Sequence, residues 1–292
     1  MRTPWGDLAV RDAHVHFFSH AFFRSLAGDE TKLPEIAAKL GWNLPGVDPN
    51  GLAETWTVEL NRHGVAGASL IASIPGDEKS VLAAQSTYPD RFLAYAMVNP
   101  MAEHVEIAYG LKAICLFPAM HRYALDDPKV EALIRQAEQA RAAVFVHCGV
   151  LTVGVRRKLG LPSPFDMRFS NPLDLHAIAL RHPKTPFLVP HFGAGCLREA
   201  LMLADLCPNV YLDTSSSNSW MRYEGLDLKT VFRRALDVAG AGRLLFGSDS
   251  SFFPRGWNAE IFDAQSKALY EMGVSAADAK LIFGENLLRV FS

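Results

Sequence analysis

The sequence alternates short runs of β-branched and aromatic residues with longer amphipathic stretches along almost its whole length. This alternation is typical of repeated strand–helix units built around a parallel sheet. The runs that read as strands lie at about residues 8–15, 65–71, 92–98, 111–117, 143–147, 187–191, 209–213 and 243–248. Because eight strands close a (β/α)₈ barrel, the pattern predicts an α/β protein with a TIM barrel.

The stretches between these runs have the periodicity of amphipathic helices. We expect helices at 52–63, 78–88, 126–141, 172–182, 195–206, 227–238 and 256–271, and a terminal helix at 275–289. Asp127 and Asn171 each precede a proline, which places a capping side chain next to a residue suited to the first helical turn. Ser275 and Asp278 form a variant of the capping box, with Asp in place of Glu.

The length of 292 residues suits one barrel domain, because a TIM barrel typically needs about 250 residues. We therefore expect a single domain over residues 1–292, with two compact domains as the alternative. A segment at about 17–51, rich in Phe, Gly and Pro, separates the first strand from its helix. We interpret it as a small irregular insertion over the barrel mouth.

An open doubly wound sheet is the competing architecture, because it produces the same alternation of strands and helices. Such a sheet usually carries a glycine-rich phosphate turn after its first strand, and this sequence has none there. Gly193-Ala-Gly195 is only half of that fingerprint and follows the sixth predicted strand. The pattern favours the closed barrel.

Composition excludes several classes of partner. The formal net charge is −2 and the calculated pI is about 6.6, so no overall positive field attracts nucleic acid or an anionic membrane. The hydrophobic fraction of 49% is enough for a large core, yet no apolar run reaches the roughly 18 residues of a membrane span. We expect a small-molecule substrate as the partner and leave a homodimer open.

The cysteines and the N-terminus indicate a cytoplasmic protein. The four cysteines show no C-x-x-C pairing, so we expect reduced structural thiols. The first residues contain neither the apolar core nor the cleavage site of a secretory signal.

Histidine and aspartate side chains end several of the predicted strands. His14 and His16 are two residues apart, so both side chains project from the same side of the first strand. His147, His191 and Asp249 close the fifth, sixth and eighth strands. Because the functional groups of barrel enzymes gather at the C-terminal ends of the strands, these five residues are expected to converge on one site.

Imidazole and carboxylate ligands suit zinc, and also iron, manganese or cobalt. A single strand-end histidine is more often structural, but the joint placement of these residues predicts a divalent metal site with one position open for water or substrate. We expect one ion per chain, most readily Zn²⁺, with Mn²⁺ or Fe²⁺ as alternatives.

The spread-out motif resembles the amidohydrolase superfamily. Its parts are D-x-H-x-H on the first strand, a histidine on the fifth, H-x-G-x-G on the sixth and G-S-D on the eighth. The chain is similar to the amidohydrolase-related branch that includes aminocarboxymuconate-semialdehyde decarboxylase, resorcylate decarboxylases and pyrone-dicarboxylate lactonase. The resemblance runs from Asp12 to Asn286 in the terminal GENLLRVF.

This resemblance implies that His14, His16, His147 and Asp249 bind the metal. It also implies that His191 acts as the acid or base beside the bound water and that Asp249 has a second, catalytic role. Two-metal relatives bridge their ions with a carboxylated Lys or a Glu after the fourth strand, whereas here that strand ends Ile-Cys-Leu-Phe-Pro, which implies one metal. Many relatives carry a Lys where this chain has Cys115, so a substrate contact made by that Lys is in doubt.

Candidate substrate contacts follow from charge and from position near strand ends. The loop after the fifth strand is basic and suits an anionic substrate, while Arg255 lies six residues beyond Asp249 and suits a carboxylate. His20 lies in the aromatic segment that follows the first strand. The candidates are His20, Arg157, Arg168, Trp220 and Arg255.

A bound divalent ion lowers the pKa of its water to about 7 and polarises a carbonyl, so we predict hydrolysis of a small, carboxylated ester, lactone or amide through a metal-bound water. The alternative is non-oxidative decarboxylation of a small aromatic or unsaturated acid, in which His191 helps to protonate carbon. A metal-binding barrel without catalysis is the third hypothesis. A serine hydrolase is set aside because the sequence has no G-x-S-x-G elbow.

Overall fold

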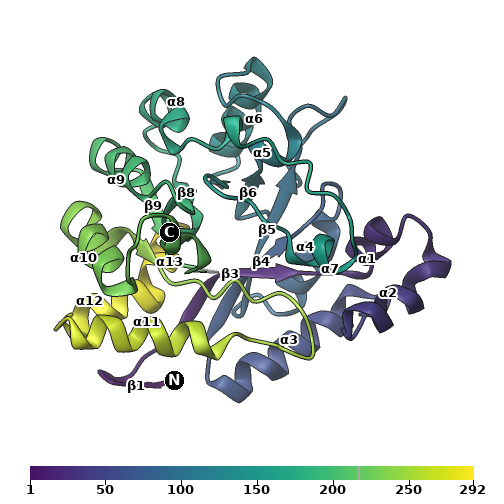
Figure 1. Cartoon of the computed structure of the whole chain (residues 1–292), viewed down its shortest axis with the longest axis horizontal. Helices are drawn as coiled ribbons and strands as arrows, with labels where there is room; N and C mark the ends of the chain where they lie inside the picture. The colour runs from purple at the N-terminus through teal and green to yellow at the C-terminus, as the bar shows by residue number, and fades with distance from the viewer. Residues whose placement is uncertain (216–217) are drawn as a thin grey trace.

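The computed structural model describes residues 1–215 and 218–292, and its centre is a barrel of parallel strands (Figure 1). The strands follow one another around the sheet in chain order. They are β3 (Arg11–Phe17), β4 (Gly67–Ala72), β5 (Phe92–Val98), β6 (Ala113–Leu116), β7 (Ala143–Val146), β8 (Phe187–Val189), β9 (Val210–Asp213) and β10 (Leu244–Leu245). All eight predicted strands are present, so the predicted (β/α)₈ fold class is confirmed.

The barrel closes between β3 and the segment that follows β10. The amide of Ala13 donates to the carbonyl of Phe246 at 2.7 Å, and the amide of His16 donates to the carbonyl of Ser250 at 2.7 Å. These bonds lie on either side of Asp249, whose own amide donates to the carbonyl of His14 at 3.0 Å. Closure therefore brings the first and eighth strand ends together, which places His14 and His16 beside Asp249.

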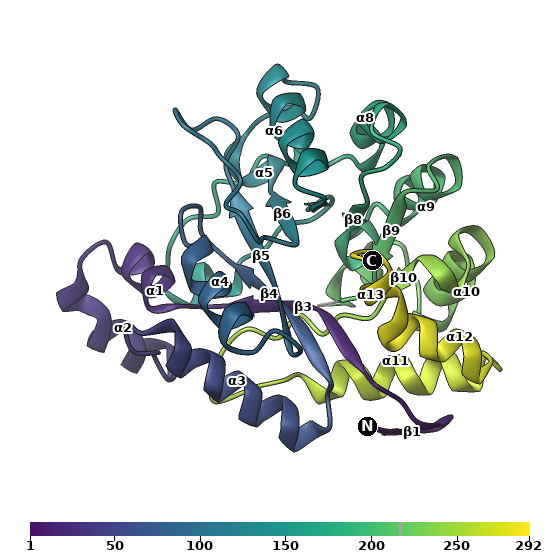
Figure 2. The same cartoon turned by 180° about the vertical axis from the view of Figure 1, so that it is seen from behind.

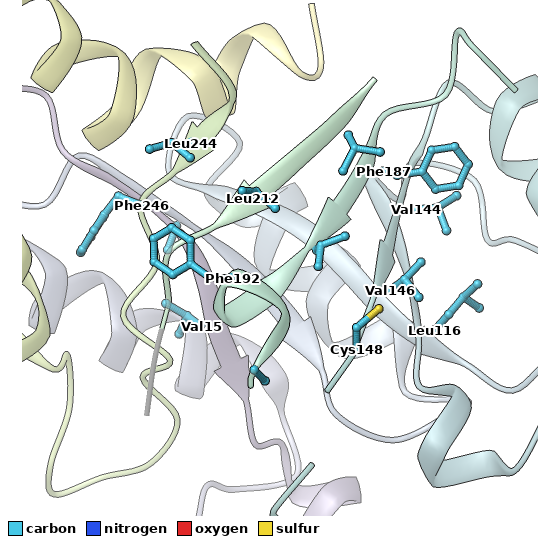
Figure 3. Packing of buried hydrophobic residues seen from close by; sticks show 14 of the residues in the cluster. Val15, Leu116, Val144, Val146, Cys148, Phe187, Phe192, Leu212, Leu244 and Phe246 are labelled. Carbon is cyan, nitrogen blue, oxygen red and sulfur yellow. The ribbon is translucent and has the colours of Figure 1, made fainter. Parts of the chain in front are cut away.

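The strands bury both of their faces, as expected for a parallel barrel. In β5, Tyr95 and Met97 belong to the cluster inside the barrel, while Ala94 and Ala96 belong to the larger cluster between strands and helices. This alternation has the two-residue period of a strand. Figure 3 shows part of the outer cluster, where Val144 of β7 lies beside Phe187 of β8, its partner in the sheet.

Helices cover the outside of the barrel (Figures 1 and 2). The longer ones are α3 (Pro49–His63), α4 (Glu78–Thr87), α6 (Pro128–Gln139), α9 (Leu197–Leu206), α10 (Leu228–Ala239) and α11 (Ala259–Glu271). The chain also has the short helices α5 (Pro118–His121), α7 (Gly154–Lys158), α8 (His176–Arg181), α12 (Ala276–Lys280) and α13 (Asn286–Arg289), and Leu287 of α13 packs in the cluster inside the barrel. The predicted caps are confirmed: Asp127 accepts from the amide of Lys129, and Ser275 accepts from the amide of Asp278 at 3.1 Å. The hydroxyl of Ser275 also donates to the Asp278 carboxylate at 2.8 Å, so the two side chains pair, although this bond takes the place of the backbone N–H bond of a standard capping box.

The segment expected to be irregular instead contains two short helices, α1 (His20–Ala27) and α2 (Leu33–Leu40). Ser19 caps α1 by accepting from the amide of Phe22, and Gly28 ends the helix in the left-handed conformation. Capping residues and an apolar helix face stabilise these helices. Both signals were overlooked in the sequence because the segment is rich in Phe, Gly and Pro. We call residues 18–44 the lid segment.

The lid segment has its own apolar cluster, and this cluster reaches two barrel loops. Phe22, Phe23, Leu40 and Trp42 pack with Val155 of α7, and Phe252 packs against them. The amide of Asn43 donates to the carbonyl of Phe253 at 2.9 Å. The lid segment is thus fastened to the loop after β7 and to the loop after β10.

The chain starts with a two-stranded antiparallel hairpin, β1 (Arg2–Thr3) and β2 (Gly6–Asp7), outside the barrel. Within the described part of the chain, every helix is too short or too polar to cross a membrane.

Candidate metal centre

The sequence candidates His14, His16 and Asp249 come together at one end of the barrel. The Nε2 atoms of the two histidines are 3.4 Å apart. Oδ1 of Asp249 lies 3.7 Å from Nε2 of His14 and 3.3 Å from Nε2 of His16. One ligand atom from each of the three residues lies within 4.8 Å of the others, which is compact enough for a single ion.

Hydrogen bonds at the far side of each ring fix the orientation of both histidines. Nδ1 of His14 lies 2.7 Å from Oδ2 of Asp213, which accepts the ring proton. Nδ1 of His16 lies 2.8 Å from Oγ of Ser73, whose own proton goes to the carbonyl of Ile71 at 3.0 Å. Ser73 therefore accepts from His16, and we infer that both rings carry the proton on Nδ1.

This tautomer leaves two Nε2 lone pairs and a carboxylate oxygen facing one point. Three such acceptors repel one another unless a cation or a proton lies between them. The donor set of two imidazoles and one carboxylate fits a divalent ion, and the outer partners Asp213 and Ser73 have the usual role of groups that orient metal-binding histidines.

Asp249 is held in an uncommon backbone conformation, with φ of 57°. A non-glycine residue in the left-handed region costs of order 1–3 kcal/mol and persists where the surroundings enforce it. Two hydrogen bonds hold this conformation. The Asp249 amide donates to the carbonyl of His14 at 3.0 Å, and Nη2 of Arg255 donates to the carbonyl of Asp249 at 3.1 Å. Burial raises the pKa of the Asp249 carboxyl, but the neighbouring imidazoles of His16, His14 and His191 outweigh burial and hold that pKa below its usual range.

The predicted ligand His147 lies beside His191 and outside the compact set of three. The two rings meet edge to face with centroids 5.3 Å apart, and Phe117 stacks on the His147 ring. Nδ1 of His147 is buried without a hydrogen-bond partner among the described residues, which is costly unless a ligand satisfies it. Burial and the nearby His191 lower the pKa of His147 well below its usual value, so its imidazole is neutral and able to coordinate.

His191 is 8% exposed, and its ring centroid lies 5.0 Å from that of His14. Its Nδ1 donates to the carbonyl of Ser215 at 2.8 Å, so Nε2 is left as the proton acceptor. Burial lowers the pKa of His191, and this effect outweighs the negative charge of Asp249, which raises that pKa. The arrangement gives a neutral imidazole next to the metal ligands, as a general base needs.

The turn that presents His191 is strained. His191 and Phe192 have φ of 56° and 52° in a short helical turn directly after β8. Gly149, in the loop after β7, faces this turn so closely that a Cβ there would lie 2.0 Å from the carbonyl oxygen of Gly193. Strain of this kind persists at functional sites where packing enforces it.

Asp12, the first residue of the D-x-H-x-H motif, supports the site from behind. It is fully buried, and Oδ1 accepts from the amides of His14 and Ser248 at 2.9 and 3.0 Å. Oδ2 accepts from Nε1 of Trp257 at 2.8 Å and from the hydroxyl of Ser248. Burial raises the pKa of Asp12 to about 6 although these hydrogen bonds oppose the rise. Asp12 thus ties the first strand to the segment that carries Asp249.

Among the predicted substrate contacts, the structure brings Arg255 to the centre. Its Nη2 donates to the carbonyl of Asp249 at 3.1 Å and to Oγ of Ser251 at 3.0 Å. Arg168 is directed elsewhere, because it forms a bidentate pair with Asp166 on the surface.

The other three candidates have different surroundings. His20 begins α1 and lies 3.6 Å from Glu30. Arg157 is exposed on α7, and no described residue pairs with it. Trp220 is 3% exposed and packs in the outer core, and its role as a substrate contact stays a prediction. Cys115 is buried inside the barrel, as expected for a strand residue.

Sequence reasoning missed the residues that orient the ligands, namely Asp213, Ser73 and Ser215. Oγ of Ser215 lies 2.9 Å from Nδ1 of His14 and 3.1 Å from Nδ1 of His191, so this serine links a candidate metal ligand to the candidate base. One signal was available: Asp213 ends the apolar run NVYLD in the same way that Asp249 ends LLFGSD. A groove of about 530 Å³ between α1 and the loop after β4 contains none of these residues and is not the metal centre.

A barrel of eight parallel strands with histidines and an aspartate gathered at one end has the layout of a barrel enzyme with a candidate metal site. The chain belongs to the amidohydrolase family, whose model matches residues 12–292. It is therefore an amidohydrolase-type enzyme, which confirms the predicted resemblance and sets aside a barrel without catalysis.

A curated relative and several solved structures are similar to this chain. Protein fluG of Emericella nidulans is 30% identical over 149 residues, which cover 50% of this chain and 17% of that protein, so the match spans a small part of the relative. A probable 2-pyrone-4,6-dicarboxylic acid hydrolase from Acinetobacter baumannii, with citric acid bound, is 16% identical with a TM-score of 0.62, covering 97% of this chain and 99% of that chain.

Two further structures carry metals. An amidohydrolase from Burkholderia multivorans with bound zinc is 17% identical with a TM-score of 0.62, covering 97% of this chain and 99% of that chain. A dihydroxybenzoic acid decarboxylase from Polaromonas with bound manganese is 14% identical with a TM-score of 0.59, covering 98% and 97%. At these identities the likeness establishes the shared barrel fold.

Proposed function

We propose that the chain is a single-metal hydrolase that cleaves a small, carboxylated ester, lactone or amide. The observation that carries this proposal is the convergence of His14, His16 and Asp249, with the two imidazole Nε2 atoms aimed at the carboxylate oxygen. His147, with its unpartnered Nδ1, is the fourth candidate ligand. A divalent ion held there would supply Lewis acidity to the substrate carbonyl and lower the pKa of water.

His191 has the chemistry of the general base in this proposal. Its Nδ1 proton is engaged by the Ser215 carbonyl, so Nε2 accepts a proton from the attacking water as the new carbon–oxygen bond forms. His191 then returns that proton to the leaving oxygen or nitrogen as the scissile bond breaks. Atoms and charge balance, because one water molecule is added across the broken bond.

Zinc is our first choice of metal and manganese the second, because two or three imidazoles with one carboxylate suit both. The metals present in the similar structures from Burkholderia multivorans and Polaromonas support this pair. We also propose a cytoplasmic location, supported by the four free cysteines, which are typical of a reducing compartment.

A decarboxylase is the second candidate, and the aromatic wall beside the metal ligands favours it. The Phe18 ring lies 5.5 Å from the His16 ring and stacks on Phe22 at 4.0 Å, which suits a flat unsaturated acid. His191 would take a proton from solvent on Nε2 and donate it to the ring carbon as carbon dioxide leaves. Release of CO₂ without consumption of water distinguishes this reaction from hydrolysis.

Metal content and turnover together test the proposal. We expect about one zinc or manganese ion per chain by plasma mass spectrometry, and loss of that ion in a His14→Ala, Asp249→Ala double variant. His191→Asn should keep the ion and lose at least 100-fold in kcat on a panel of carboxylated esters and lactones, since general bases contribute 10² to 10⁴. His104→Ala, an exposed histidine in the loop after β5, is the matched control. A wild type that takes up no metal after reconstitution would overturn the proposal.

A further inference from the structure

Two positive side chains converge on one aromatic ring next to the metal centre. Cζ of Arg255 lies 4.6 Å from the centroid of Phe252, and Nζ of Lys158 lies 5.6 Å from the same centroid. Lys158 also lies 5.4 Å from the ring of Trp42, which stacks on Phe252 at 4.0 Å with an interplanar angle of 10°. The lid segment, α7 and the loop after β10 therefore contribute to one cluster.

Neither cation has an acidic partner among residues 1–215 and 218–292. Arg168 and Arg181, by contrast, pair with Asp166 and Glu131 at 2.6 and 2.8 Å. Of the Arg255 guanidinium nitrogens, only Nη2 donates to protein acceptors, which are the Asp249 carbonyl and the Ser251 hydroxyl. Its remaining donors are available, and its planar fork suits a carboxylate.

The cluster is continuous with the metal ligands. Nη2 of Arg255 donates to the main-chain carbonyl of Asp249 at 3.1 Å. On the other side, Phe18 bridges His16 and Trp42, with ring centroids 5.5 and 6.1 Å apart. A small molecule that reaches Asp249 is thus within reach of Phe252 and its two cations.

We propose that Lys158 and Arg255 together bind a carboxylate of the substrate that lies away from the reacting group, with Phe252 and Trp42 as the floor of this subsite. Both cations lie within 5.6 Å of the Phe252 centroid without a carboxylate partner, so their like charges favour an anionic ligand there. The inference deepens the proposed function, on which it rests, and it names Lys158 in place of Arg157 and Arg168 as the basic contact from the loop after β7.

Binding of paired probes tests the subsite without any turnover. We would titrate zinc-loaded protein with isophthalate and with 3-carbamoylbenzoate, which differ only in one carboxylate, and likewise with glutarate and its monoamide. Wild type should bind each dianion about tenfold more tightly than its amide, a difference of roughly 1.4 kcal/mol. Lys158→Gln and Arg255→Gln should each remove most of this preference, and Lys158→Arg should retain it.

Lys129→Gln and Arg234→Gln remove the same charges from exposed positions on α6 and α10 and should keep the preference. Thermal unfolding of every variant checks that folding is intact. The subsite would be overturned if wild type showed no preference for the dianion, or no binding at all. It would also be overturned if the preference survived in the Lys158→Gln, Arg255→Gln double variant. Hydrolysis is measured separately, so an intact preference with no turnover counts against the reaction, and turnover with no preference counts against the subsite alone.

Discussion

Asp213 lies directly behind His14, with Oδ2 accepting the Nδ1 proton at 2.7 Å while Oδ1 accepts from the amide of Ser215 at 2.6 Å. One carboxylate thus orients His14, a proposed metal ligand, and holds Ser215, whose carbonyl accepts a hydrogen bond from His191, the proposed base. The two proposed functions are therefore linked by the end of β9, a strand that supplies none of the predicted ligands.

Replacing this carboxylate should weaken metal binding without unfolding the protein. An asparagine in its place has only one side-chain oxygen and no charge, so it cannot accept both hydrogen bonds. We expect Asp213→Asn to lower zinc affinity about 10- to 100-fold, the usual effect of losing a group that orients a ligand. Competition with a chelator measures the affinity, and Asp205→Asn, exposed on α9, is the control. Equal affinities in variant and wild type would contradict the role given to Asp213.

Gly247, the glycine of the G-S-D motif, is a position in the site with no room for a larger side chain. A Cβ there would lie 2.7 Å from Oδ1 of Asp213, 2.7 Å from Cβ of Ser215 and 2.9 Å from Cβ of His14. We expect Gly247→Ala to displace these side chains, to reduce metal content and to lower stability by about 1–3 kcal/mol, as overpacking does. Gly242→Ala, where a Cβ meets nothing within 4 Å, should behave like wild type in metal analysis and urea unfolding.

The sequence predicted the barrel well because its determinants are local. Each strand is a short apolar run, and the predicted range 92–98 coincides with β5. The ligand positions were accessible for the same reason: polar residues that end apolar strands of a barrel share one face. The lid helices escaped prediction because α1 and α2 are short and their apolar faces merge with neighbouring aromatic residues.

The sequence pattern did not predict the hydrogen-bond partners of the candidate ligands. Ser73 is a lone polar residue after a strand and Ser215 is one of several in a polar run, and nothing in the chain order pairs Ser73 with His16 or Ser215 with His191. Such pairings depend on barrel curvature and on the strained turn at His191, which arise only from tertiary packing. Trp220 marks a second limit, since chain order does not distinguish an aromatic residue that packs in the core, as this one does, from one that lines a pocket.

Removal of Trp42 should loosen the lid segment while the barrel stays folded. The ring is 8% exposed and stacks on Phe252, and it also meets Phe18 and Phe23 with centroids 6.1 and 6.2 Å away. We expect Trp42→Ala to cost up to about 3 kcal/mol, towards the low end for a large aromatic because the loss is confined to a surface segment. Limited proteolysis should cut the lid segment faster than in Val47→Ala, whose side chain is 75% exposed. Unchanged cleavage in Trp42→Ala would show that the aromatic stack does not hold the lid segment.

Glu131 on α6 provides a test of stability against pH at a distance from the metal centre. Its carboxylate accepts from Arg181 at 2.8 Å and lies 3.0 Å from Nε2 of His182. The hydrogen bond from Arg181, with the contribution of His182, lowers the pKa of Glu131 to about 2. A lowered pKa in the folded state means that the charged form stabilises the fold above the ordinary value of 4.5, and that this contribution is lost as pH falls towards 2.

We therefore expect Glu131→Gln to be less stable than wild type at pH 7, by about 1 kcal/mol because the partner Arg181 is half exposed. The difference should stay constant down to about pH 5 and should shrink as the pH falls further, since protonation of wild-type Glu131 removes the same charge. Urea unfolding at pH 7, 5, 4 and 3 measures it, with the exposed Glu54→Gln of α3 as the control. If the difference in the free energy of unfolding between wild type and Glu131→Gln grew as the pH fell, the pH dependence would be opposite to the one predicted. Glu131 would then not be the source of a stabilising charge.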